Sequence, residues 1–135
     1  MKIINSVQII NQAQADELLA RLPFRSKYIF LIGMETGLRI SDILILKIKD
    51  IENPLHVYVS RTDTIQRFLI SESLYAQLTV FAGLRYPDNY LFPSTQNKRL
   101  HLHRTTYHRD LKRATAELGF VCSAHSTRKF YLRSK

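Results

Sequence analysis

The segment ETGLRISDILILKIKDI, residues 35–51, decides the fold that we expect, because it carries the chain from one helix into the next. Gly37 follows an almost wholly apolar stretch and is placed to end a helix in a left-handed turn. Ser41 favours the start of a short helix over residues 42–47. Arg39 lies at the junction, where its five donors can bind a phosphate group bidentately; the alternative is a surface ion pair with a neighbouring carboxylate.

Helical periodicity surrounds this segment on both sides. Asn11 and Gln14 match a capping box, and an apolar stripe that stops at Pro23 follows them. Further along, Gly119 is placed to end another amphipathic helix. The sequence therefore predicts helices that start after Asn11, at Ser26, at Asp42, at Ser71 or Ser73, at Thr105 and near His125.

Between the third and fourth of these helices the pattern changes to that of a strand. Residues 55–60 alternate with period two and are rich in β-branched side chains, residues 67–70 read as their partner, and residues 61–66 as the connecting turn. We therefore expect a mainly α fold with a small antiparallel β-hairpin, an α+β class, in a single domain that comprises residues 1–135.

Composition is that of an ordinary globular protein. The chain has 135 residues, of which 45% are hydrophobic and 23% charged, and Cys122 is its single cysteine. These values argue against disorder, and the apolar runs are too short for a signal peptide or a membrane span. We expect a soluble, cytoplasmic protein without an internal disulfide, encoded by a bacterium, a phage or another mobile element.

The positive charge is concentrated at one end of the sequence. The net charge is +9, and residues 96–135 hold ten Lys and Arg against only Asp110 and Glu117. Residues 1–95 are nearly neutral, with ten basic and nine acidic side chains. Such a one-sided field favours a polyanion, most often nucleic acid. An anionic membrane surface and mere solubility are the alternatives.

Few other residues suggest chemistry. His101 and His103 lack further ligands at a metal-binding spacing, and nothing orients a histidine toward Cys122 as a nucleophile. We therefore expect no metal and no cofactor. His125 and Arg128 lie three residues apart, so one helical face would present both to a phosphate; a solvated helix end is the alternative.

Three motifs in this order resemble the tyrosine recombinases, the phage integrase family. They are the segment 35–51 with Arg39, the loop Tyr90-Leu91-Phe92-Pro93-Ser94, and Ala124-His125-Ser126-Thr127-Arg128-Lys129-Phe130, which is similar to the family's His-x-x-Arg motif. The expected hairpin falls between the first two motifs, as it does in the family. The likeness covers nearly the whole chain and corresponds to the leading part of the family's catalytic domain, without the core-binding domain.

The resemblance implies a site for DNA strand breakage and rejoining, in recombination or integration. In the family a tyrosine attacks the scissile phosphate; Arg39 and Arg128 would hold that phosphate, with His125 as their partner. The implied partners are double-stranded DNA and further copies of the chain, with no membrane. Further basic residues expected to contact DNA are Arg61, Arg67, Lys98, Arg99, Arg104 and Lys129.

Two departures from the family limit this expectation. Arg61 stands where the family has a lysine that protonates the leaving oxygen, and an arginine with a pKa above about 12 is a poor proton donor. Tyr131 is the sole tyrosine after Arg128, and we interpret it as packing rather than as the nucleophile. The catalytic domain therefore reads as truncated before that tyrosine.

Four hypotheses remain open about how such a chain works. The chain is the DNA-binding part of a recombinase that cannot cleave alone, or a non-catalytic DNA-binding protein derived from an integrase, or it takes a tyrosine from another chain. The fourth is a basic helical module for RNA or a protein partner, with the motif matches accidental. If the final helices are missing, apolar surface should be exposed around a small group of side chains and promote self-association. These are Phe120, Val121, Phe130 and Tyr131.

Overall fold

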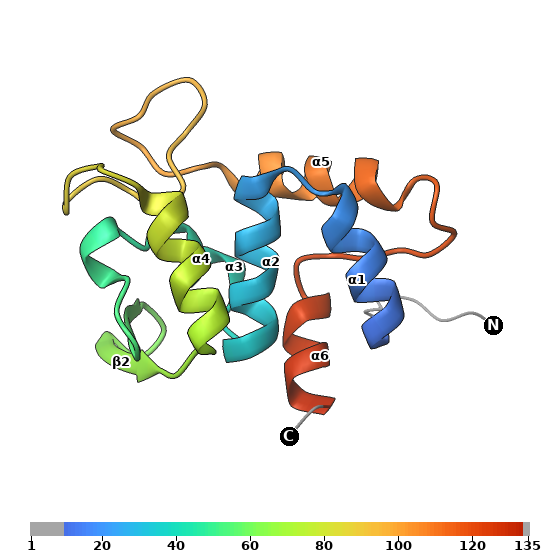
Figure 1. The fold of residues 1–135 in the computed structure, drawn as a ribbon, viewed down its shortest axis with the longest axis horizontal. Coiled ribbons are helices and arrows are strands. Elements are labelled where there is room, and N and C mark those ends of the chain that lie inside the picture. The colour runs from blue at the N-terminus through green and yellow to red at the C-terminus, as the bar shows by residue number, and fades with distance from the viewer. Residues whose placement is uncertain (1–9, 134–135) are drawn as a thin grey trace.

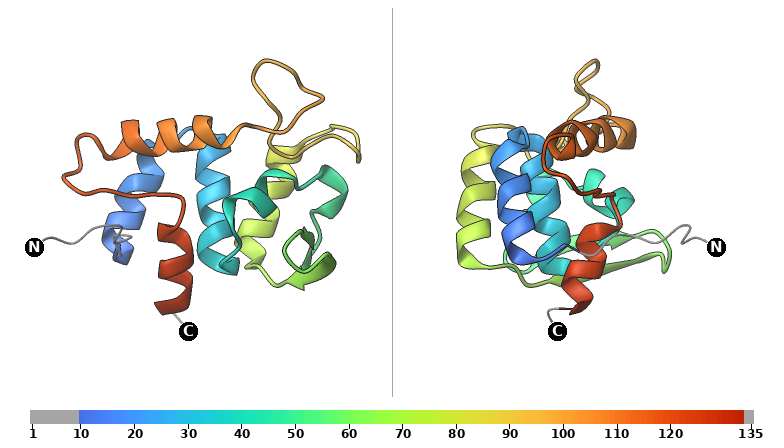
Figure 2. Two further views of the ribbon diagram at one scale, coloured as in Figure 1. Left: turned by 180° about the vertical axis from the view of Figure 1, so that it is seen from behind. Right: turned by 90° about the vertical axis from the view of Figure 1, so that its right-hand side faces the viewer.

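Helix α2 runs through the middle of the computed structural model, which describes residues 10–133 (Figure 1). The mainly helical fold with one antiparallel hairpin is confirmed. Its elements are α1 (Gln12–Arg21), α2 (Phe24–Thr36), α3 (Ile40–Leu44), the 3₁₀ helix η1 (Ile48–Asp50), β1 (Leu55–Val59), β2 (Thr64–Phe68), α4 (Glu72–Ala82), α5 (Arg104–Thr115) and α6 (Ser126–Arg133). Seen from the side, α2 lies between α1 and α4 on one face and α5, the hairpin and α6 on the other (Figure 2, right).

The first helix begins and the second ends as the sequence predicts, whereas α2 starts at Phe24, two residues before the predicted Ser26. The side chains of Asn11 and Gln14 form the expected capping box at the start of α1. Helix α2 ends at Gly37, which has a φ of 73° and donates its N–H to the carbonyl of Gly33 at 2.9 Å. Because that conformation is strained for any residue with a Cβ, the glycine fixes the direction in which the chain leaves α2.

Two predicted helix starts are wrong. Arg39, not Ser41, is the N-cap of α3, because its extended backbone turns its carbonyl toward the N–H groups of Asp42 and Ile43. His103, not Thr105, is the N-cap of α5, since its Nδ1 accepts a hydrogen bond from the Thr105 N–H at 3.1 Å.

The hairpin is shifted from its predicted position. Strand β2 starts at Thr64, three residues before the predicted start, and pairs Thr64 with Val59 and Phe68 with Leu55. The signal for this strand is weak because Thr64 and Gln66, on the face that turns toward the pocket, are polar. The connecting turn therefore comprises only residues 60–63, with Asp63 in the left-handed region at a φ of 53°.

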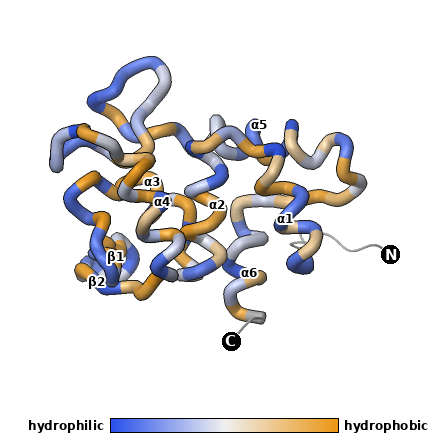
Figure 3. The backbone as a smooth tube through the Cα atoms, viewed as in Figure 1, coloured by the Kyte–Doolittle hydropathy of each residue, from blue (hydrophilic) through white to orange (hydrophobic). Residues whose placement is uncertain are grey.

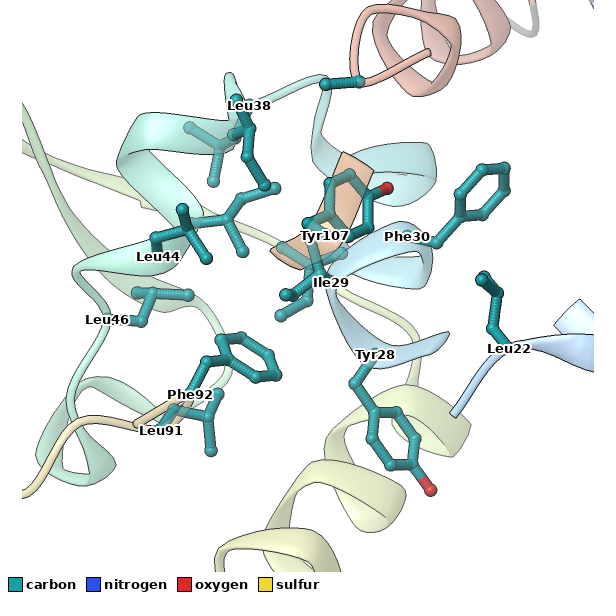
Figure 4. Close-up of a cluster of buried hydrophobic side chains, with 14 of the residues drawn as sticks. Leu22, Tyr28, Ile29, Phe30, Leu38, Leu44, Leu46, Leu91, Phe92 and Tyr107 are labelled. Atoms are coloured by element: carbon teal, nitrogen blue, oxygen red, sulfur yellow. The ribbon is translucent and has the colours of Figure 1, made fainter. Parts of the chain in front are cut away.

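The hydrophobic core lies between α2 and the segments around it. Tyr107 of α5 is buried beside Ile29 and Phe30 of α2, while Leu91 and Phe92 close the core below them (Figure 4). Much of the loop before α5 is hydrophilic and projects away from this core (Figure 3). Within residues 10–133 we find no helix that is both long and apolar enough to cross a membrane.

Helix α6 packs against α2 through small residues. A Cβ on Gly33 would lie 2.5 Å from Thr127 Oγ1, and a Cβ on Gly37 would lie 2.4 Å from the ring of Tyr131. The two glycines are one helical turn apart, as are Thr127 and Tyr131, so one face of α6 fits along one face of α2. This close approach brings the C-terminal motif to the end of α2.

The prediction of an exposed apolar patch is mostly wrong. Phe120 and Phe130 pack against the core, and Tyr131 is half-buried against Gly37. Of the four side chains that we expected to be exposed, only Val121 is. Leu132 of α6, which we did not predict, is exposed too. The packing of α6 on α2 therefore covers most of the apolar surface that the sequence alone left without a partner.

Candidate functional site

A pocket of about 240 Å³ opens where the end of α2, the start of α3, the hairpin and α6 meet. Its walls combine the two arginines of the sequence motifs, one carboxylate and the inner face of the hairpin. They are formed by Thr36, Gly37, Leu38, Arg39, Asp42, Val59, Gln66, Phe68, Arg128, Tyr131 and Leu132. Segments far apart in the sequence thus bring Arg39 and Arg128 together, as predicted.

Arg128 is held in this pocket by the backbone of the glycine turn. Its Nε donates a hydrogen bond to the carbonyl of Gly37 at 2.7 Å. Burial and then the positive charges of Arg39 and Arg61 lower the pKa of Arg128, while Asp42 acts in the opposite direction. A guanidinium remains charged at neutral pH despite such a shift, so the pocket concentrates positive charge that an anion would neutralise.

Arg39 lies at the N-cap of α3, and the part of the chain that the structure describes does not show the alternative of a surface ion pair with a neighbouring carboxylate. The carboxylate of Glu35 instead accepts hydrogen bonds from the backbone and hydroxyl of Ser71 at 2.6 and 2.9 Å. Asp42 is only 4% exposed and lies in the pocket wall. Among the described residues, no salt bridge involves Arg39.

The hairpin places Arg61 and Arg67 differently. Arg61 lies in the turn two residues beyond Val59, and its charge acts on Arg128. Arg67 lies on the outer face of β2, because Gln66 and Phe68 on either side of it line the pocket. Side chains alternate along a strand, so Arg67 faces away from the two motif arginines.

His125 does not line the pocket. It lies just before α6, is exposed, and acts electrostatically on His108 of α5. Burial, Arg104 and His125 together lower the pKa of His108. The structure therefore brings two of the three predicted phosphate-binding side chains together and leaves His125 toward α5, although it is three residues from Arg128.

The other predicted DNA contacts are spread over the surface. Lys98 and Arg99 line a separate hollow of about 340 Å³ with Lys47, whose ammonium lies over the ring of Tyr90. Arg104 and Lys129 are exposed, at the start of α5 and on α6. Among the residues that the structure describes, no group of three or more His, Cys, Asp or Glu could hold a metal ion.

Several residues that build the pocket were not identified from the sequence. The two close contacts with Gly33 and Gly37 depend on how α6 packs, which local periodicity does not show. Gln66 and Phe68 could have been found from the period-two alternation, had the register of β2 been known. Asp42 was not identified as a pocket residue, whereas α3 turns it inward.

Comparison with known proteins identifies the family of this chain. Residues 5–133 match the model of the Phage integrase family. The chain is 30% identical over 144 residues to the probable integrase/recombinase YoeC of Bacillus subtilis (strain 168), and the match covers all of this chain and 79% of that protein.

Solved structures of recombinases share the fold. The XerA recombinase matches with a TM-score of 0.79 at 17% identity over 99% of this chain, and a DNA-bound λ integrase (residues 75–356) matches with 0.74 at 17% over 98%. A λ integrase tetramer bound to a Holliday junction matches with 0.74 at 17% over 98% of this chain and 43% of its own. The chain spans about half the length of the first two structures, 51% and 52%. It belongs to the phage integrase family, whose members are the tyrosine recombinases.

Proposed function

We propose that this chain forms the phosphate-binding part of the catalytic domain of a site-specific tyrosine recombinase. Its substrate is double-stranded DNA, and Arg39 and Arg128 hold the scissile phosphate between them. The observation that carries the proposal is that these two arginines, from separate motifs, share the walls of one pocket. Residues 1–135 act as one domain, consistent with the family match over residues 5–133.

The chemistry of strand transfer fits this pocket. When a nucleophile attacks a phosphodiester, the transition state accumulates negative charge on the non-bridging oxygens. Fixed guanidinium groups stabilise that charge without reorganising, as donors arranged in advance do in other enzymes. The Gly37 carbonyl holds Arg128 in the wall, where the charge of Asp42 also acts on it, so this guanidinium meets the phosphate already oriented.

His125 and the outer basic residues contact the DNA strand around this phosphate. His125 lies outside the pocket, so it meets the same phosphate only when a strand lies across the start of α6. Arg61, at the hairpin turn, binds phosphate without serving as a proton donor. Weaker backbone contacts come from Arg67, Lys98, Arg99, Arg104 and Lys129.

The 135-residue chain by itself binds DNA and does not cleave it. The family's reaction needs a tyrosine hydroxyl as the attacking group, and the single tyrosine after Arg128 is Tyr131. Its ring packs against Gly37, in the role of a structural side chain. Several copies act together on one DNA site; λ integrase, which has the same fold, has been solved as a dimer on a core site and as a tetramer on a Holliday junction.

A nicked duplex that traps covalent intermediates tests both halves of the proposal. In a mobility-shift assay we expect the chain to retard the duplex, and after denaturation we expect no protein–DNA adduct. A failure to retard any duplex at low salt would contradict the DNA-binding function. An adduct that survives denaturant, and that the variant Tyr131→Phe abolishes, would overturn the assignment of Tyr131 as packing and show that the chain can cleave DNA through this tyrosine.

A further inference from the structure

The hairpin turn, residues 60–63, is exposed, and side-chain hydrogen bonds stabilise it. Tyr58 Oη donates to Asp63 Oδ1 at 2.6 Å, across the turn. Asp63 has a φ of 53°, a conformation that aspartate adopts more readily than most residues. The backbone adds two bonds, from the N–H of Thr62 to the Val59 carbonyl and from the N–H of Asp63 to the Ser60 carbonyl, at 3.2 and 3.3 Å.

A second set of bonds braces the pocket side of the same turn. The hydroxyls of Thr62 and Thr64 are 2.7 Å apart, and the Gln66 amide donates to both, at 3.2 and 3.1 Å. Gln66 itself lines the pocket with Arg39 and Arg128. The two networks therefore hold the turn from its outer face, through Tyr58, and from its pocket face, through Gln66.

Arg61 lies between these two networks. It is exposed, and the neighbouring strand residues Val59 and Gln66 form part of the pocket wall. A two-stranded hairpin is at best marginally stable in water, so an unbraced turn would place an arginine at its tip in many positions. Ordering a long side chain on binding costs free energy, and a braced turn avoids part of that cost.

We propose that Tyr58 and Asp63 are positioning residues, which hold the hairpin turn so that Arg61 meets the same phosphate as Arg39 and Arg128. The inference rests on the proposed function, because it assumes that this pocket binds a DNA phosphate. It adds a third guanidinium to the site and assigns a role to an exposed tyrosine and an exposed aspartate. Neither residue needs to touch the DNA.

The hydrogen bond between these two residues requires the Tyr58 hydroxyl to keep its proton. The bond to Asp63 raises the pKa of the Tyr58 hydroxyl above its ordinary value of 10.0. Tyr58 therefore remains a protonated donor at neutral and mildly alkaline pH. Its effect on DNA binding should not change between pH 6 and pH 9, which separates it from a titrating contact.

A double-mutant cycle tests the positioning role. We expect Arg61→Ala to weaken duplex binding about 10-fold and Tyr58→Phe, which changes no charge, to weaken it about 3-fold. In the Arg61→Ala background, Tyr58→Phe should have no further effect. An equal loss in both backgrounds would overturn the inference, because Tyr58 would then act independently of Arg61. Circular dichroism melting confirms that each variant is folded.

Asp63 offers a matched pair of substitutions with the same change in charge. Asp63→Asn keeps an oxygen that accepts the bond from Tyr58, whereas Asp63→Gly loses the acceptor but tolerates the positive φ. We expect Asp63→Gly to bind about 3-fold more weakly than Asp63→Asn, and this difference should vanish when Arg61 is alanine. Equal affinities of the two variants would overturn the inference.

The same titrations separate this inference from the proposed function. If Arg39→Ala weakens binding but Tyr58→Phe does not, the pocket binds phosphate and the positioning role fails. If neither Arg39→Ala nor Arg61→Ala changes the affinity, the proposed function itself fails, and the inference fails with it.

Discussion

Asp110 shows how a single residue ties two elements together. Its carboxylate is 5% exposed and accepts hydrogen bonds from Arg25 at 3.0 and 3.2 Å and from Ser26 at 2.5 Å. These bonds join α5 to the first turn of α2. Asp110 thus holds α5, which follows the loop of residues 90–94, to α2, which leads into the segment with Arg39.

Replacing this carboxylate should therefore destabilise the protein. We expect Asp110→Ala to lower the free energy of unfolding by about 3 kcal/mol, because it leaves the Ser26 hydroxyl and the Arg25 guanidinium without their acceptor. Urea titration measures the change. Asp88→Ala is the matched control, since its ion pair with Lys49 is exposed, and it should leave the midpoint unchanged. Equal shifts for both variants would contradict this account.

His108 predicts how stability depends on pH. Burial first, then the charges of Arg104 and His125, lower its pKa in the folded chain from 6.5. As the pH falls below about 6.5, the unfolded chain binds this proton before the folded chain does, so stability is lost toward the lower, folded pKa. Above that range both states are neutral and the effect disappears.

Replacing His108 alone isolates its contribution to the pH dependence of stability. In urea titrations at pH 8 and pH 5.5, His108→Gln should lose less stability between the two values than the parent chain does. The same pH dependence in both proteins would show that other groups account for it.

The sequence was informative for residues whose role is local. Gly37 and the capping pair Asn11 and Gln14 were predicted because each acts on the backbone within four residues of itself. Arg39 and Arg128 were predicted through the family motifs. The partly buried ion pair of Arg25 with Asp110 was not predicted, since neither residue carries any local sign of a partner on another helix.

At the scale of elements, the contact of α6 with α2 sets the pocket. Gly37→Ala would combine a left-handed φ with a Cβ placed 2.4 Å from the ring of Tyr131, whereas Gly119→Ala has a φ of +79° and nothing within 4 Å of its Cβ. We expect Gly119→Ala to cost about 1 kcal/mol and Gly37→Ala at least about 3 kcal/mol. Thermal or urea unfolding measures both.

DNA binding adds a second readout for this pair of variants. Because the Tyr131 ring must shift to admit the new methyl group and Tyr131 shares the pocket wall with Arg128, Gly37→Ala should also weaken DNA binding, and Gly119→Ala should not. Equal unfolding costs would mean that Tyr131 yields easily and that the contact does not determine where α6 lies.

The helices were easier to predict than the hairpin, for a physical reason. A helix can be recognised in a sequence from apolar residues every three or four positions and from its capping residues. Strand β2 has polar residues at Thr64 and Gln66 on its pocket face, so the period-two pattern is lost where the site is built. The polar residues that face the pocket therefore make the strand hard to recognise from the sequence.

At the scale of the whole molecule, several described basic residues of positions 96–132 line three separate hollows. Arg128 faces the pocket with Arg39, Lys98 and Arg99 line a hollow with Lys47, and Arg113 lines another of about 570 Å³ with Arg21 and Arg25. The sequence shows the excess of positive charge in this segment, and the fold shows over which surfaces that charge is distributed.

This division still predicts a strong dependence on salt. Each phosphate contact releases about one counterion, so the affinity for DNA should fall steeply between 50 and 200 mM salt, with a slope of several units in a double-logarithmic plot. Anisotropy titrations over that range measure it. A slope near zero would mean that the basic side chains do not contact the DNA backbone.

The central claim is that Arg39 and Arg128 bind one phosphate in a common pocket, and titration of a labelled duplex with single and double alanine variants tests it most directly. We predict that each single variant binds at least about 10-fold more weakly with an almost unchanged melting temperature. The double variant should lose less than the sum of the two free-energy changes. Arg21→Ala, which removes the same charge from the salt bridge with Glu117, is the control and should change little. The claim is contradicted if both pocket variants bind as Arg21→Ala does, or if they lose affinity only because they unfold.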